Sequence, residues 1–101
     1  MATVGFQEQL SSRLKKITGI EEAYIYGSYA QNTMDSHSDI DVLIIGNAGT
    51  VVIQKSINKL QKDIDREISV TVMSETDFKR RVKEKNPFVA GILKQKYIKI
   101  I

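Results

Sequence analysis

The chain has few of the residues that bind metals through sulfur or nitrogen. Its 101 residues include no cysteine and a single histidine, His37. Without cysteine the chain can form neither a disulfide nor a thiolate zinc site, and one histidine disfavours a nitrogen-rich metal site. Oxygen ligands remain, and these favour magnesium or manganese.

Long apolar segments are also missing. No run approaches the roughly 20 apolar residues that cross a membrane, and the first residues lack the basic and apolar regions of a signal peptide. Apolar residues make up 42% of the chain and charged residues 27%, which is typical of a globular protein with one modest core. We therefore expect a cytoplasmic protein with a single domain over residues 1–101 and no membrane partner.

Charge is distributed unevenly along the chain. Residues 1–50 contain three Lys/Arg and six Asp/Glu, whereas residues 51–101 contain twelve and six. The basic half could face nucleic acid or an acidic partner. No aromatic residues interleave its lysines, as a nucleic-acid platform would need, so nucleic-acid binding is disfavoured and solvated helix faces are the simpler interpretation.

Hydrophobic periodicity predicts alternating helices and strands. Apolar residues recur at helical spacing in two stretches and alternate with polar residues in a third. These positions are Phe6, Leu10, Leu14 and Ile17, then Val52, Ile53, Ile57, Leu60 and Ile64, and finally Ile68, Val70 and Val72. The predicted helices cover residues 4–18, 29–32, 49–64, 74–85 and 87–93, and the predicted strands cover 20–26, 39–45, 67–73 and 97–101. We expect an α/β (α+β) fold with a mixed three- to four-stranded sheet and helices mainly on one face.

The most informative segment follows the first predicted strand. Gly27 and Ser28 are separated by ten residues from Asp39 and Asp41, which open the second predicted strand. Side chains two apart on a strand share a face, so both carboxylates can converge on one magnesium ion. Glycine lets the backbone approach an oxyanion closely, and the serine hydroxyl can donate to a phosphate. The segment therefore predicts a metal-nucleotide site; Tyr29 could stack on a base or simply pack against the first helix.

This pattern resembles the signature of the DNA polymerase β-type nucleotidyltransferase superfamily, and the small size resembles its minimal nucleotidyltransferases. Residues 66–72, 74–78 and 86–88 are similar to the second half of such stand-alone domains. The resemblance implies the nucleotidyltransferase fold and transfer of a nucleoside monophosphate from a nucleoside triphosphate to a hydroxyl. In that scheme Gly27 and Ser28 bind the nucleotide, while Asp39 and Asp41 are catalytic and hold two metal ions, Mg²⁺ or alternatively Mn²⁺.

Two positions depart from the family pattern. Ser69 stands on the third strand where an acidic or amide residue is expected, and Glu67 lies two residues earlier on the same predicted face. Glu67 is therefore the candidate third catalytic carboxylate, with an exposed strand-start glutamate as the alternative. Gln31 stands where many relatives have an arginine, and glutamine cannot supply that charge.

Two functions follow from the resemblance. One is an enzyme that transfers AMP, from ATP as the favoured nucleotide, to a hydroxyl on a partner protein, as the antitoxin of a HEPN/MNT toxin–antitoxin pair. The alternative is a catalytically weak or inactive module of the same fold that neutralises a partner by forming a complex. Residues 98–101 are mostly apolar and should be paired in a sheet or covered by another subunit, which favours a homodimer or a hetero-complex.

Overall fold

The computed structural model describes residues 5–27, 29–30 and 39–101. Ser28, Gln31 and His37 lie outside these described residues. The elements are α1 (Phe6–Lys15), β1 (Ile20–Tyr26), β2 (Ile40–Gly46), α2 (Thr50–Ile64), β3 (Ile68–Met73), α3 (Glu75–Lys83), α4 (Pro87–Lys94) and β4 (Ile98–Lys99). Each predicted strand and each of the four longer predicted helices is present. The predicted short helix at 29–32 is described only at Tyr29 and Ala30, which lie in a turn.

The four strands form one mixed sheet in the order β3-β2-β1-β4. β1 pairs antiparallel with both β2 and β4, whereas β2 and β3 are parallel. The parallel pair is possible because α2 provides the long crossover that such a connection requires. The fold class predicted from the sequence is confirmed, with β2 as a central strand.

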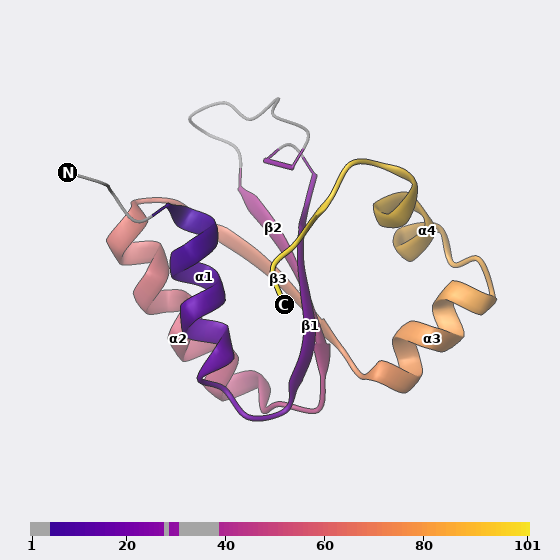
Figure 1. The fold of residues 1–101 in the computed structure, drawn as a ribbon, viewed down its shortest axis with the longest axis horizontal. Helices are drawn as coiled ribbons and strands as arrows, with labels where there is room; N and C mark the ends of the chain where they lie inside the picture. Colours follow the sequence, from indigo (N-terminus) through magenta and orange to yellow (C-terminus); the bar gives the residue numbers. More distant parts are fainter. Residues whose placement is uncertain (1–4, 28, 31–38) are drawn as a thin grey trace.

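Helices lie on both sides of the sheet (Figure 1). The two long helices, α1 and α2, cover one face, and their buried side chains Leu10, Leu14, Ile53, Ile57 and Leu60 form the larger core with even-numbered residues of β2. Val52 was expected in this stripe but is 54% exposed, because Ile53 occupies the inward position of the first turn of α2.

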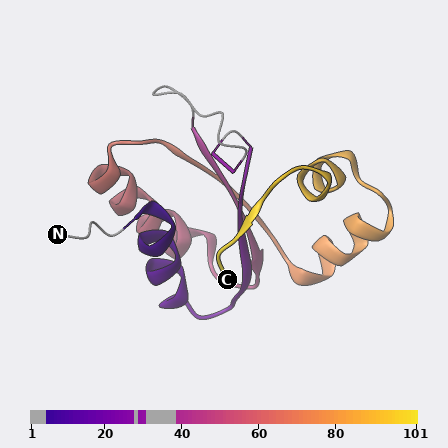
Figure 2. The ribbon, with the colours of Figure 1, turned by 45° about the horizontal axis from the view of Figure 1, so that its top comes forward.

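Helices were expected mainly on one face of the sheet, but the second face is also covered by helices. Leu43 and Ile45 of β2 point to this face and form a smaller core with Val89 and Ile92 of α4. Figure 2 shows α3 and α4 as a separate pair, on the side of the sheet opposite α1 and α2. The reason is that β2 is apolar on both faces from Val42 onward, as a central strand covered on both sides must be. The helices are therefore divided between the two faces.

Capping residues determine where the short helices begin. Ser74 Oγ accepts a hydrogen bond from the Asp77 amide at 3.0 Å, as its capping-box sequence predicts. Asn86 Oδ1 accepts from the Phe88 amide at 3.0 Å, and Pro87 occupies the first turn of α4. These caps place α3 directly after β3 and orient the first turn of α4.

The end of the chain is paired within the sheet. β4 is shorter than the predicted 97–101, but the Ile100 amide also donates to the Ala23 carbonyl at 2.8 Å. The apolar end of the chain is therefore paired with β1, which is one of the two arrangements expected for it. Within the described residues, none of the helices has the length and apolar character needed to cross a membrane.

Candidate functional site

Gly27 ends β1 and lies directly against Asp41. Its φ of +74° is in the left-handed region that favours glycine. A Cβ atom at this position would lie 2.5 Å from Asp41 Oδ2. The missing side chain of Gly27 therefore provides the space that the Asp41 carboxylate occupies, which links the two halves of the predicted motif.

Asp41 lies inside β2, and Asp39 precedes the strand and is exposed. Burial raises the pKa of the Asp41 carboxyl above its ordinary value, and the nearby negative charge of Asp39 raises this pKa further. A bound cation would remove the repulsion between these two carboxylates. The donor set, two neighbouring carboxylates of which Asp41 occupies the space left by Gly27, fits an oxygen-ligated divalent ion.

The third strand places a hydroxyl beside Asp41. In the parallel pairing of β2 with β3, Asp41 lies opposite Ser69 and Ile40 lies opposite Ile68. Paired residues point to the same face, so Ser69 occupies the position closest to Asp41 on this strand. The acidic residue expected there is indeed replaced by a serine.

Glu67 lies just before β3. Its carbonyl accepts a hydrogen bond from the Ile40 amide at 3.0 Å, which places its backbone beside the start of β2. Its side chain is exposed and borders a groove formed with α2 and the turn that follows, next to Asp65. Over residues 5–27, 29–30 and 39–101, no three acidic or histidine side chains gather as a metal-binding cluster. The structure thus brings the strand ends of Asp39 and Glu67 together, but does not group Glu67 with the two aspartates, and its role stays a prediction.

Tyr26 is a neighbour of the site that the sequence reasoning missed. In the antiparallel pairing of β1 with β2 it lies directly opposite Asp41. Burial raises the pKa of the Tyr26 hydroxyl, a side-chain hydrogen bond with Thr71 lowers it, and the charge of Asp41 raises it. Tyr26 is half-buried and remains protonated at neutral pH. Its position before Gly27 was visible in the sequence, but its partner across the sheet depends on the register.

Tyr29 does not extend this site. Its ring makes an edge-to-face contact with Phe6 of α1, with ring centroids 5.4 Å apart, and it packs against the larger core. The structural alternative predicted for Tyr29, packing against the first helix, is therefore the observed one.

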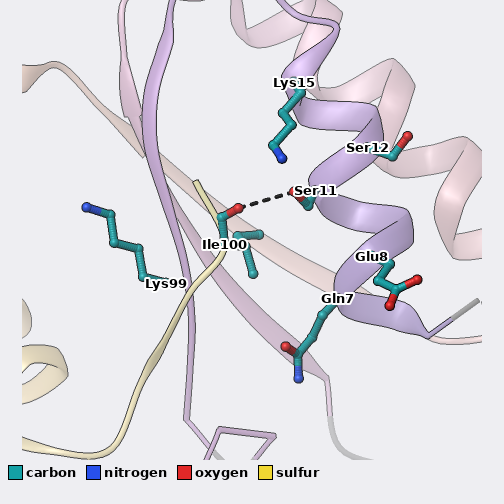
Figure 3. Close-up of a pocket in the computed structure, with 7 residues that line it drawn as sticks. All are labelled: Gln7, Glu8, Ser11, Ser12, Lys15, Lys99 and Ile100. Carbon is teal, nitrogen blue, oxygen red and sulfur yellow. Dashed lines mark hydrogen bonds between the residues drawn. The ribbon is translucent and has the colours of Figure 1, made fainter.

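A separate surface groove of about 480 Å³ lies between α1 and the end of the chain (Figure 3). Ser11 Oγ donates to the Ile100 carbonyl at 3.2 Å, and Lys15 of α1 and Lys99 of β4 also line the groove. None of the predicted site residues lines this groove. The groove and the predicted site therefore share no residue among those described.

Comparison with known proteins agrees with the fold. A search of curated proteins found no significant match. Solved structures similar in fold include a mutant of the toxin–antitoxin MntA–HpeT, with 14% identity, and a toxin–antitoxin with AMP-PNP, with 16% identity. In both cases the TM-score is 0.64, and the match covers 94% of this chain and 72% of the other. At this identity the likeness establishes the fold alone.

The family model of the nucleotidyltransferase domain matches residues 7–100. The match includes both halves of the motif, from Gly27 to Asp41, and the strand that carries Ser69. With the strand order, the glycine–aspartate contact and this match taken together, the chain belongs to the nucleotidyltransferase domain family.

Proposed function

We propose that this chain transfers a nucleoside monophosphate, with AMP favoured, from a metal-bound nucleoside triphosphate to a hydroxyl on a partner protein. The observation that supports the proposal most directly is the contact between Gly27 and Asp41. It joins a backbone turn suited to phosphate with a carboxylate suited to a cation, as the family's reaction requires.

In this reaction the acceptor oxygen forms a bond to the α-phosphorus, the bond to the pyrophosphate leaving group breaks, and the acceptor proton passes to a base. Asp39 and Asp41 would hold Mg²⁺ or Mn²⁺, which when bound stabilises the charge of the attacking and leaving oxygens. Gly27, with Ser28 as predicted from the sequence, would bind the phosphates. Glu67 is the proposed base, because the pairing of Ile40 with Ile68 places its backbone at the same end of the sheet as Asp39.

The partner protein is proposed from the kind of molecule found among the structural neighbours. The two structures described above are toxin–antitoxins, and one of them contains AMP-PNP. This supports a toxin as the acceptor and ATP as the nucleotide for the present chain, and the resemblance found in the sequence suggests that the toxin is of the HEPN type. In this proposal the chain acts as the antitoxin.

Incubation with Mg²⁺, ATP labelled at the α-phosphate and the protein encoded by the neighbouring gene tests the proposal. We expect label on the partner with the wild-type chain and none with Asp39→Ala or Asp41→Ala, because each variant removes one proposed metal ligand. An Asp65→Asn variant is the control: this exposed residue has φ +54°, a conformation that asparagine tolerates. Absence of label transfer from a folded wild-type chain contradicts the enzymatic proposal.

Ser69 favours a second candidate function, a non-catalytic module that neutralises its partner by forming a complex. The serine leaves the position beside Asp41 without a third carboxylate. In that case, inhibition of the partner survives both aspartate substitutions and no label is transferred. The same assay therefore separates the two functions.

The contribution of Glu67 can be measured separately. We expect Glu67→Gln to slow label transfer about 100-fold, the lower range for loss of a general base, while ATP binding stays unchanged. Asp65→Asn again provides the control, because Asp65 borders the same groove. If Glu67→Gln transfers label at the wild-type rate, Glu67 is an exposed strand-start residue and not a catalytic one.

A further inference from the structure

Two aromatic side chains flank the Asp41 end of the site. Tyr26 of β1 and Phe88 of α4 are in edge-to-face contact, with ring centroids 5.9 Å apart and an interplanar angle of 88°. They come from elements more than sixty residues apart in the sequence. Their contact brings the first turn of α4 to the end of β1 that holds Gly27.

The strand register places this pair at the site. Tyr26 is the direct partner of Asp41 across the antiparallel pair, and paired residues have Cβ atoms about 5 Å apart on one face. Gly27, which contacts the Asp41 carboxylate, follows Tyr26 in the chain. The aromatic pair is therefore within the reach of one nucleotide from the proposed phosphate and metal ligands.

Phe88 is held in position but is not needed for the core. The cap by Asn86 Oδ1 to the Phe88 amide orders its backbone, and Pro87 precedes it. Val89 and Ile92 bury the inner side of α4, whereas Phe88 is 39% exposed. An ordered phenyl ring with one side open to water offers an apolar surface to a flat ligand.

We propose that Tyr26 and Phe88 form the subsite for the base of the nucleotide, with the base stacked on the exposed ring of Phe88. This inference rests on the proposed function, because it takes the triphosphate to bind at Gly27 and Asp41. Aromatic rings stack on any base, so the subsite accepts purines and favours them through their larger area. Tyr26 is a positioning residue: its ring supports that of Phe88 from the sheet, and its hydrogen bond with Thr71 orients it.

The chain contains a matched control for Phe88. Tyr97 is 40% exposed and also makes an edge-to-face contact with a tyrosine of β1, Tyr24, with centroids 5.5 Å apart. Tyr24 lies two residues before Tyr26 on the same face, about 7 Å farther from Gly27 along the strand. Substitution of Tyr97 therefore removes an aromatic ring that is as exposed as Phe88 and lies on the same side of the sheet, but away from the site.

The test compares binding of ATP with binding of inorganic tripolyphosphate, both with Mg²⁺, by titration calorimetry. We expect Phe88→Ala to weaken ATP about tenfold, the usual loss for one stacked base, and to leave tripolyphosphate unchanged. Tyr97→Ala should change neither, and Phe88→Trp should restore ATP binding. Circular dichroism verifies that each variant is folded.

The outcomes separate this inference from the proposed function. Equal weakening of ATP and tripolyphosphate by Phe88→Ala, or an unchanged affinity for ATP, overturns the base subsite while leaving the transfer reaction intact. Loss of label transfer to the partner with unchanged ATP affinity also overturns it, because Phe88 then contacts the acceptor. If the wild-type chain binds neither ligand in a manner that depends on Asp41, both the inference and the proposed function fail.

Discussion

Replacing Asp41 by asparagine should slow nucleotidyl transfer by about 1,000-fold or more and at the same time make the metal-free protein more stable to heat. The amide has the shape of the carboxylate and still fits the space left by Gly27, but it has no charge for a metal ion. Loss of a metal that supplies several kcal/mol of transition-state stabilisation slows transfer about 1,000-fold or more. The midpoint of thermal unfolding should rise by about 2 °C, because the substitution removes a half-buried charge beside Asp39.

The pH dependence of stability tests the same feature. The pKa of Asp41 is higher in the folded protein than its ordinary value of 3.8, so the folded state binds this proton more tightly than the unfolded state. The contribution of Asp41 to the stability of the metal-free wild type therefore falls as pH rises through the interval above 3.8, and the advantage of Asp41→Asn develops over that interval. Below it the carboxyl is protonated in both states and the advantage disappears.

Thermal unfolding of both proteins between pH 3 and 7, in chelator and then in Mg²⁺, measures these effects. Mg²⁺ should stabilise the wild type and not Asp41→Asn, because only the wild type retains both ligands. A variant that unfolds at a lower temperature than the metal-free wild type at pH 7 would disprove the assignment of Asp41 as a destabilising charge.

Replacing Gly46 by alanine should have the largest effect on stability. Gly46 ends β2 with φ +152°, and a Cβ there would lie 2.1 Å from the Gly19 carbonyl oxygen and 2.9 Å from the Glu21 amide nitrogen. These are backbone atoms of β1 and of the residue that precedes it, so no side-chain rotation relieves the overlap. The strand ends must separate, and we expect a loss of about 3 kcal/mol or more, a large part of the stability of a domain this size.

Urea unfolding followed by circular dichroism gives the free energy directly. Gly91→Ala is the control, because no atom lies within 4 Å of the added methyl group and the position is inside α4. Alanine should stabilise that helix by about 0.5–1 kcal/mol. A Gly46→Ala variant within 0.5 kcal/mol of the wild type would mean that the β1 and β2 ends are not held as closely as described.

Local sequence signals predicted the elements well. β1 runs from Ile20 to Tyr26 as predicted, because aromatic and β-branched residues favour the strand and Gly27 ends it. The start of α4 was predicted in the same way: Asn86 caps the helix, and Pro87 is its first residue. A mixed sheet was also predicted, and the long crossover through α2 permits its parallel pair of β2 and β3.

Features that depend on pairing could not be predicted in the same way. No local pattern places Tyr26 opposite Asp41, since that depends on the register of β1 against β2. The contact of Phe88 with Tyr26 also requires α4 to pack on the second sheet face, and an apolar strand does not indicate which helix will cover each side. The sequence thus contained the proposed ligands, whereas the surroundings of the site came from the tertiary structure.

The two helical layers bury different numbers of side chains against the sheet. Among the described residues the core under α1 and α2 has eleven buried side chains, the core under α3 and α4 has six, and α3 buries none of its own. Local opening costs the least free energy where the fewest apolar contacts are broken. We therefore expect the helical layer that presents Phe88 to open at a lower free-energy cost than the layer of α1 and α2. A ligand that bridges Phe88 and Asp41 would close the layer of α3 and α4 on binding, and part of its binding energy would be used for that closure.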